Sequence, residues 1–285
     1  MTIQQSYDPA RVALDAAQRE LVGEPLPPVR IGRRVRIITW TASIVWMLCV
    51  GSIALLVVLD DPGFVAWLYA ATCTFLPPVV WHAIIQARVS GRMLGVWAQQ
   101  RGVRYARKAT QAELPVWAEG DWLVPGDSRS YRNVSSWTAR GRELLLTQLS
   151  WRVQPKANHG PYLVAACRVG SGLRVRIEER SRTNRIIGMV GRDDAPAGMA
   201  EWSSGVPAFD ERLRVRAHGG DDATHRGLLT TRTATALSAT DGIEADLTRG
   251  LLVVRRAWRS QLDPAVVDEL VTVLLLLAED LDADR

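Results

Sequence analysis

The sequence contains few cysteines. Its 285 residues include three, Cys49, Cys73 and Cys167, with no Cys-x-x-Cys spacing among them. A disulfide framework needs paired cysteines and a cysteine-based zinc site needs closely spaced ones, so we expect neither. We interpret the three residues as small hydrophobic side chains.

Short catalytic signatures are also missing. The sequence has no Walker phosphate-binding loop, no GxGxxG turn, no GxSxG nucleophile elbow and no HExxH pair. Gly170 and Gly172 stand between two expected strands, without a following helix whose amides would bind a phosphate. We therefore expect no cofactor and lean against an enzyme, although an enzyme with an unrecognised site stays open as a third possibility.

Strong compositional bias is absent as well. Hydrophobic residues make up 47% and charged residues 23%, which is typical of a globular protein. The net charge of +5 and the pI of about 9.5 would suggest a nucleic-acid partner. However, residues 25–112 alone hold ten basic and two acidic residues, and the rest of the chain is at −3. Because the excess is local, we expect no nucleic-acid partner.

The sequence does have two long apolar runs. Residues 37–59 contain no Asp, Glu, Lys or Arg, and a helix of this length reaches roughly 35 Å, enough for a hydrocarbon core of about 30 Å. A second uncharged run, residues 64–85, follows a turn containing Asp60, Asp61, Pro62 and Gly63. We predict a transmembrane helical hairpin. The first run is too long and starts too late for a cleaved signal peptide.

Basic residues flank the predicted hairpin, whereas the turn between its helices has none. Cytoplasmic loops carry an excess of Lys and Arg, so both termini are expected in the cytoplasm and the protein in the cell membrane. This membrane flank consists of Arg30, Arg33, Arg34, Arg36, Arg88 and Arg92. Trp40, Trp67 and Trp81 lie near the ends of the two runs, where indole rings favour the membrane interface.

The second run contains His82 and the Pro77-Pro78 pair. An intramembrane imidazole is a candidate for proton or ion handling. His82 is six residues from Arg88, however, and this depth favours a neutral side chain at the interface. Pro77 and Pro78 remove two backbone donors and are expected to kink the helix. Two helices alone form no transport pathway, so we favour an anchor or assembly hairpin.

The remaining sequence predicts a cytoplasmic α+β domain with a mostly antiparallel sheet and a covering C-terminal helix. Strands are expected in residues 144–153, 162–169, 173–180, 185–190, 213–217, 242–247 and 251–256. The turn Gly170-Ser171-Gly172 predicts a hairpin between the second and third of these strands. Helices are expected in residues 223–229, onward to about residue 237, and from Asp263 and Pro264 to about residue 281. The apolar stretch of this last helix is too short to cross a membrane.

We divide the chain into five parts by these patterns. They are a cytoplasmic amphipathic helix in residues 1–24, a basic linker in 25–36, the transmembrane hairpin in 37–88, a juxtamembrane helix with a basic linker in 89–112, and the α+β domain in 113–285. Asp8 as N-cap, Pro9 at the first helical position and Gly23 as a stop define the N-terminal helix.

Two groups of residues in the domain are candidate binding sites. Alternation along the strands predicts an arginine face that docks on anionic lipid or an acidic partner, or else pairs with Glu178, Asp210 and Glu211 in solvent. Its members are Arg174, Arg176, Arg212, Arg214 and Arg216. The second group, His218, Asp221, Asp222 and His225, has the ligand types for a divalent metal. It surrounds Gly219-Gly220, where aspartates are expected as helix caps, so we assign no metal.

Several motifs resemble one family of proteins. They are Trp97-Ala98 followed by Arg101-Gly102 and Tyr105, the stretch from Phe209 to Arg216, Leu228-Leu229-Thr230, and Gly250 to Val254 before a helix. In these the chain resembles a family of uncharacterised bacterial membrane-anchored proteins, common in actinobacteria. The resemblance covers most of the chain and implies a two-helix anchor before a cytoplasmic α+β domain of unknown function. The chain departs from the family pattern at Thr231, where Pro is typical, and between residues 121 and 141.

The leading hypothesis is a membrane-anchored, non-enzymatic interaction or regulatory protein with an unknown protein partner or a second copy of itself. The alternative is an accessory subunit of a membrane transport or envelope-assembly complex, in which the second helix and His82 contact other spans.

Overall fold

The computed structural model describes residues 8–26, 33–60, 63–108, 114–115, 117, 128–153, 157–180, 198–218, 228–257 and 263–282. The chain divides into two compact units. The first, here the sheet unit, comprises Met1–Pro27, Trp97–Trp258 and Pro264–Arg285. The second, here the helical unit, comprises Pro28–Val96 and Arg259–Asp263. Each is described by itself.

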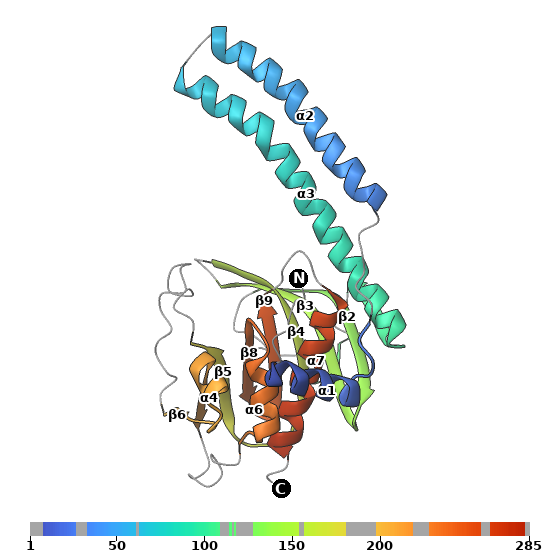
Figure 1. Ribbon diagram of the computed structural model, residues 1–285, viewed down its shortest axis with the longest axis vertical. Helices are drawn as coiled ribbons and strands as arrows, with labels where there is room; N and C mark the ends of the chain where they lie inside the picture. Colours follow the sequence, from blue (N-terminus) through green and yellow to red (C-terminus); the bar gives the residue numbers. More distant parts are fainter. Residues whose placement is uncertain are drawn as a thin grey trace, which may run out of the picture. The chain divides into compact units, whose positions relative to one another are not determined.

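The sheet unit contains one nine-stranded sheet in the order β1-β2-β3-β4-β9-β8-β5-β7-β6, and every pairing is antiparallel (Figure 1). The prediction of an α+β fold with a mostly antiparallel sheet is confirmed. The strands are β1 (Arg104–Lys108), β2 (Ser128–Ala139), β3 (Arg142–Val153), β4 (Ala157–Arg168), β5 (Arg174–Glu179), β6 (Ala200–Trp202), β7 (Leu213–His218), β8 (Ile243–Thr248) and β9 (Leu251–Ala257).

The helices of the sheet unit begin where local chemistry favours a helix start. In α1 (Pro9–Leu21) the Asp8 side chain accepts a hydrogen bond from the amide of Ala10, as the sequence predicts. α6 (Thr231–Ser238) is capped by the Thr230 hydroxyl. α7 (Pro264–Asp282) begins with proline and ends within a residue of the expected boundary. The short α4 (Pro207–Arg212) leads directly into β7.

Three helices form two layers over one face of the sheet. α7 contacts β4 and β9, while α1 and α6 contact α7 and each other (Figure 1). α7 is consequently buried on all sides from Val267 to Ala278. This explains why its middle is apolar around the whole helix, since a helix that carried only a sheet-facing stripe would have a polar outer face.

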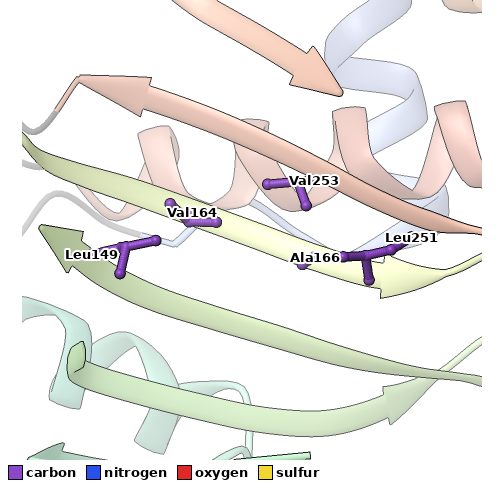
Figure 2. Close-up of a cluster of buried hydrophobic side chains, with 5 residues drawn as sticks. All are labelled: Leu149, Val164, Ala166, Leu251 and Val253. Atoms are coloured by element: carbon purple, nitrogen blue, oxygen red, sulfur yellow. The ribbon is translucent and has the colours of Figure 1, made fainter. Parts of the chain in front are cut away.

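The opposite face of the sheet has its own apolar cluster. Leu149 of β3, Val164 and Ala166 of β4, and Leu251 and Val253 of β9 lie on three neighbouring strands and are buried (Figure 2). Trp117, Tyr131 and Tyr162 pack against them. This half of the sheet is therefore apolar on both faces.

The predicted hairpin between residues 162–169 and 173–180 is wrong. β4 pairs with β3 and β9, and β5 pairs with β7 and β8, so two strands separate β4 from β5 in the sheet. The turn before β5 leads away from β4 because the Val169 and Gly170 amides donate to Gly250 and to Asp282 of α7. The predicted pair of β8 and β9 is confirmed, with Arg249 and Gly250 at positive φ in its turn.

The sheet unit extends beyond residues 113–285. It includes α1 and the end of α3, and residues expected in a linker form the edge strand β1. β2 also lies in a region for which the sequence predicts no strand. The strand expected in residues 185–190 lies outside the described residues, as do residues 223–227 of an expected helix.

The helical unit consists of α2 (Arg33–Asp60) and most of α3 (Phe64–Gln100). The two helices contact each other, since the indole nitrogen of Trp46 donates to the carbonyl oxygen of Cys73 over 3.3 Å. Within the described residues, Ile37–Leu56 is the one segment long and apolar enough to cross a membrane, and Val65–Trp81 of α3 is shorter. This measure does not confirm the predicted second span. α3 continues past Gly91 and ends before Gly102, as expected.

Candidate functional site

The arginine face lies on β5, β7 and β8. It is turned away from α7, because the alternating residues Val175 and Ile177 of β5 line the gap beside α7. Arg176 of β5 is the register partner of Arg216 in β7, and Glu178 is the partner of Arg214. Asp246 of β8 is the register partner of Arg176 on its other side. The structure thus brings four of the five predicted arginines onto one face, but with acidic side chains interleaved among them.

Most of these arginines form ion pairs within the sheet. Arg216 is only 6% exposed and lies 3.0 Å from a carboxylate oxygen of Glu178. Arg176 contacts the same carboxylate at 3.1 Å, and Arg214 lies 3.5 Å from Glu201 of β6. Arg174 is exposed at the start of β5. Of the expected acidic partners, Glu178 is confirmed, whereas Glu201 and Asp246 stand in place of Asp210 and Glu211. Binding of this face to anionic lipid stays a prediction.

Arg212 does not belong to this face. The alternation in the sequence places it on a strand, whereas the structure ends α4 at Arg212 and starts β7 at Leu213. Its guanidinium donates to the carbonyls of Ser238, the last residue of α6, and of Thr240 just beyond it, and contacts Asp241. Arg212 therefore fixes the end of α6 to the sheet.

The metal candidate is only partly described. The ring Nδ1 of His218 lies 2.6 Å from the carbonyl oxygen of Gly198, which fixes the ring beside the turn that leads to β6. Asp221, Asp222 and His225 lie outside the described residues. Among the described residues no group of three or more His, Cys, Asp or Glu side chains is placed to hold a metal ion.

The residues predicted at the membrane lie on α2 and α3. Trp40, Trp67 and Trp81 are each more than half exposed, and Arg92 is exposed. For five of the predicted residues the structure describes the helix backbone but not the side chain: Arg33, Arg34, Arg36, His82 and Arg88. Arg30 lies outside the described residues.

No sequence motif indicated the most buried charged site among the described residues. Asp268 of α7 is fully buried and accepts from the indole of Trp97 at 2.8 Å and from Arg101 at 2.7 Å. Arg101 also donates to the carbonyl oxygen of Glu24, just after α1. We call Trp97, Arg101 and Asp268 the Asp268 cluster. The ring of Trp137 in β2 packs edge-on against Trp97, with centroids 5.6 Å apart.

The next residue of α7 has a similar role. Glu269 accepts from Arg11 of α1 at 2.5 Å and from Arg256 of β9 at 3.1 Å. Adjacent acids in an otherwise apolar helix were a visible sign of buried partners, because an ionised carboxylate is rarely buried without a cation or several donors. The sequence alone could not identify those partners, which come from α1, α3 and β9.

Two further features of the sheet unit are a buried thiol and a small gap beside α7. Burial raises the pKa of the Cys167 thiol to about 12, which disfavours the reactive thiolate. A small gap between α7 and the sheet is lined by apolar side chains alone. Such a gap has no polar group to orient a substrate.

The chain matches no protein-family model and no curated protein. Among solved structures it is similar to the crystal structure of the mycobacterial trehalose monomycolate transport factor A, TtfA. The two share 17% sequence identity over 67% of this chain and 93% of that chain, with a TM-score of 0.46. We transfer no function at this level of similarity, and the resemblance to the actinobacterial family stays a prediction.

Proposed function

We propose that α2 and α3 both cross the cell membrane and hold the sheet unit at its cytoplasmic face, as a non-enzymatic interaction or regulatory module. The observation that supports the two crossings is the packing of α1 with α6 and α7 in one unit. α1 precedes α2 in the chain, whereas α6 and α7 follow α3. Elements that pack together lie on the same side of a membrane, so the chain between them crosses it an even number of times.

This parity favours a second crossing by α3. If Ile37–Leu56 crosses the membrane, a single span would separate α1 from the helices that it contacts. α3 is the element available for the return. Exposed apolar side chains occur along α3 from Val65 to Ile84. This part of the helix is about 30 Å long, which matches the thickness of a hydrocarbon core.

The exposed surface of the helical unit also supports membrane insertion. Apart from Val12, the exposed large apolar side chains of the described residues all lie between Ile37 and Ile84. An apolar surface of this extent is stable in lipid and aggregates in water. The contact between the helices uses small or hydroxylated residues, such as Gly51 beside Thr74, which permit close approach in a membrane.

The cytoplasmic orientation rests on the basic residues of the sequence. Arg33, Arg34 and Arg36 begin α2, Arg88 and Arg92 follow the apolar part of α3, and the turn between the helices contains Asp60 and Asp61. An excess of Arg at both outer ends favours placing them in the cytoplasm. The sheet unit would lie there with them.

Cysteine labelling tests this topology in intact cells. A chain with Cys49, Cys73 and Cys167 changed to Ala would carry one new cysteine at Gly63 in the turn, at Arg19 of α1 or at Arg107 of β1. We expect a membrane-impermeant maleimide to label G63C in intact cells, and R19C and R107C only after permeabilisation. Opposite sides for R19C and R107C would disprove the parity argument, and protection of G63C in both conditions would remove the second crossing.

Purification of the full chain in mild detergent then separates the interaction proposal from the alternative. Soluble proteins bound in stoichiometric amounts support the regulatory module. A stoichiometric membrane protein, lost when exposed positions such as Phe75 of α3 are changed, would instead favour the accessory subunit of a membrane complex. A co-purified small molecule with no protein partner would contradict both and return the enzyme to consideration.

A further inference from the structure

α1 covers α7 with few buried side chains. Its apolar contact consists of Leu14, Ala17 and Leu21, whereas the opposite side of the helix is exposed. α7 beneath it is buried on all sides from Val267 to Ala278. The outer face of α7 is therefore shielded from water only while α1 and α6 stay in place.

The polar contacts that hold α1 are mostly at the surface. Arg232 of α6 pairs with Glu20 at 2.5 Å, and both side chains are about half exposed. Arg11 is also nearly half exposed, whereas its partner Glu269 is buried and would keep its ion pair with Arg256 if α1 left. Exposed ion pairs contribute little to stability, because water screens them and ordering two long side chains costs entropy.

The centre of the contact contains a buried polar group that finds no partner in the part of the chain that the structure describes. Gln18 is 2% exposed, and its amide nitrogen Nε2 has no hydrogen-bond partner among the described residues. A buried donor left unpaired loses its hydration with no compensation, so it destabilises the docked state relative to a detached helix in water. With an apolar residue at position 18, α1 would dock more tightly on α6 and α7.

We propose that α1 is a displaceable strap over α7, which detaches from α6 and α7 while the nine-stranded sheet stays folded. Leu14, Ala17 and Leu21 hold the strap, and Gln18 weakens it. Opening uncovers the apolar outer face of α7. This device lies within the sheet unit and does not rest on the membrane topology proposed above.

Hydrogen exchange of the full chain in detergent micelles measures this opening directly. We expect amides of α1 to exchange at least about tenfold faster than those of β3 and β4, because a sub-global opening exposes α1 alone. Gln18→Leu should slow exchange in α1 by about tenfold and leave β3 unchanged. Arg19→Leu, on the exposed side of the same helix, is the matched control and should leave both rates unchanged.

Two results would overturn the proposal. One is that the amides of α1, β3 and β4 all exchange at the same rate, because α1 would then detach only when the whole unit unfolds. The other is an equal effect of Gln18→Leu and Arg19→Leu on α1. Leu14→Ala is a second, independent test in case the Gln18 variant does not fold. It should speed hydrogen exchange in α1 by at least about tenfold and leave the exchange rate of β3 unchanged. Equal acceleration of β3 would again exclude a separate strap.

Discussion

The guanidinium of Arg101 lies 2.7 Å from the fully buried carboxylate of Asp268, although 167 residues separate them in the sequence. Arg101 follows the last turn of α3 and Asp268 lies near the start of α7. The carboxylate also accepts from Trp97. One buried anion therefore holds the chain that leaves α3 against the central helix of the sheet unit.

Removing this anion should destabilise the sheet unit strongly. Asp268→Ala leaves the partly buried guanidinium of Arg101 and the buried indole N–H of Trp97 without their acceptor. We expect the free energy of unfolding to fall by about 3–5 kcal/mol. Urea unfolding of the purified chain, followed by circular dichroism, measures the change. Glu279→Gln, half-buried on the same helix and without an ion pair among the described residues, should cost less than about 0.5 kcal/mol. Similar losses in both variants would contradict the role of Asp268.

The arginine face should prove to be structural at Arg216 and replaceable at Arg174. Arg216 is buried beside Glu178, whereas Arg174 is exposed at the start of the same strand pair. We expect Arg216→Gln to lower the free energy of unfolding by about 1–3 kcal/mol and Arg174→Gln to change it by less than about 0.5 kcal/mol. Thermal unfolding of both variants decides. An unchanged melting temperature for Arg216→Gln would show that the ion pair with Glu178 contributes nothing.

Local signals in the sequence identified α1 and α7 well, missed β1 and β2, and predicted the neighbours of the strands poorly. The boundaries of α1 and α7 follow from Asp8, Pro9 and Pro264, because capping depends on residues within one turn. The turn at Gly170 and Gly172 is equally local, yet β4 and β5 are not neighbours, since β8 and β9 arrive later in the chain and lie between them. A turn signal fixes a change of direction and leaves the partner of a strand open.

The Asp268 cluster was beyond prediction for a related reason. An acidic residue within an apolar helix indicates a buried cation, but the choice of Arg101 depends on how α3 enters the sheet unit. The packing of α1 on α6 and α7 is likewise a long-range property. The alternation of arginines correctly predicted one face of β7. It also placed Arg212 on that strand, whereas Arg212 is the last residue of α4.

Cys167 should be unreactive in the folded protein. Burial raises its pKa to about 12, so almost no thiolate is present at pH 8. We expect iodoacetamide to leave Cys167 unmodified in the native chain at pH 8 and to modify it fully in urea, as read by peptide mass spectrometry. Cys167→Ala removes the signal and serves as the control for peptide assignment. Rapid native alkylation would mean that β4 opens far more often than its burial implies.

Asp280 should make the sheet unit more stable in acid than a typical aspartate would. Burial raises the pKa of Asp280 above its ordinary value, against opposing hydrogen bonds from Thr230 and Thr233. Its protonated form is therefore favoured by folding, and this contribution is complete below pH 3.8 and lost as the pH rises through the raised pKa. We expect Asp280→Asn to gain stability relative to the unmodified chain as the pH rises from 3 to 7. A constant difference in melting temperature over that range would contradict this.

Asp210 provides the opposite case on the same unit. Burial alone would raise its pKa, but hydrogen bonds from Ser203, Ser204 and Gly205 outweigh burial and lower the pKa below 3.8. The ionised form is favoured by folding, so its contribution is present above pH 3.8 and lost as the pH falls through the lowered pKa. Asp210→Asn should therefore have a lower melting temperature than the unmodified chain at pH 7, and the difference should shrink toward pH 3. As the pH rises, the melting temperature relative to the unmodified chain should therefore increase for Asp280→Asn and decrease for Asp210→Asn. If both variants instead kept a constant difference from the unmodified chain, these carboxylates would not control the acid stability of the fold.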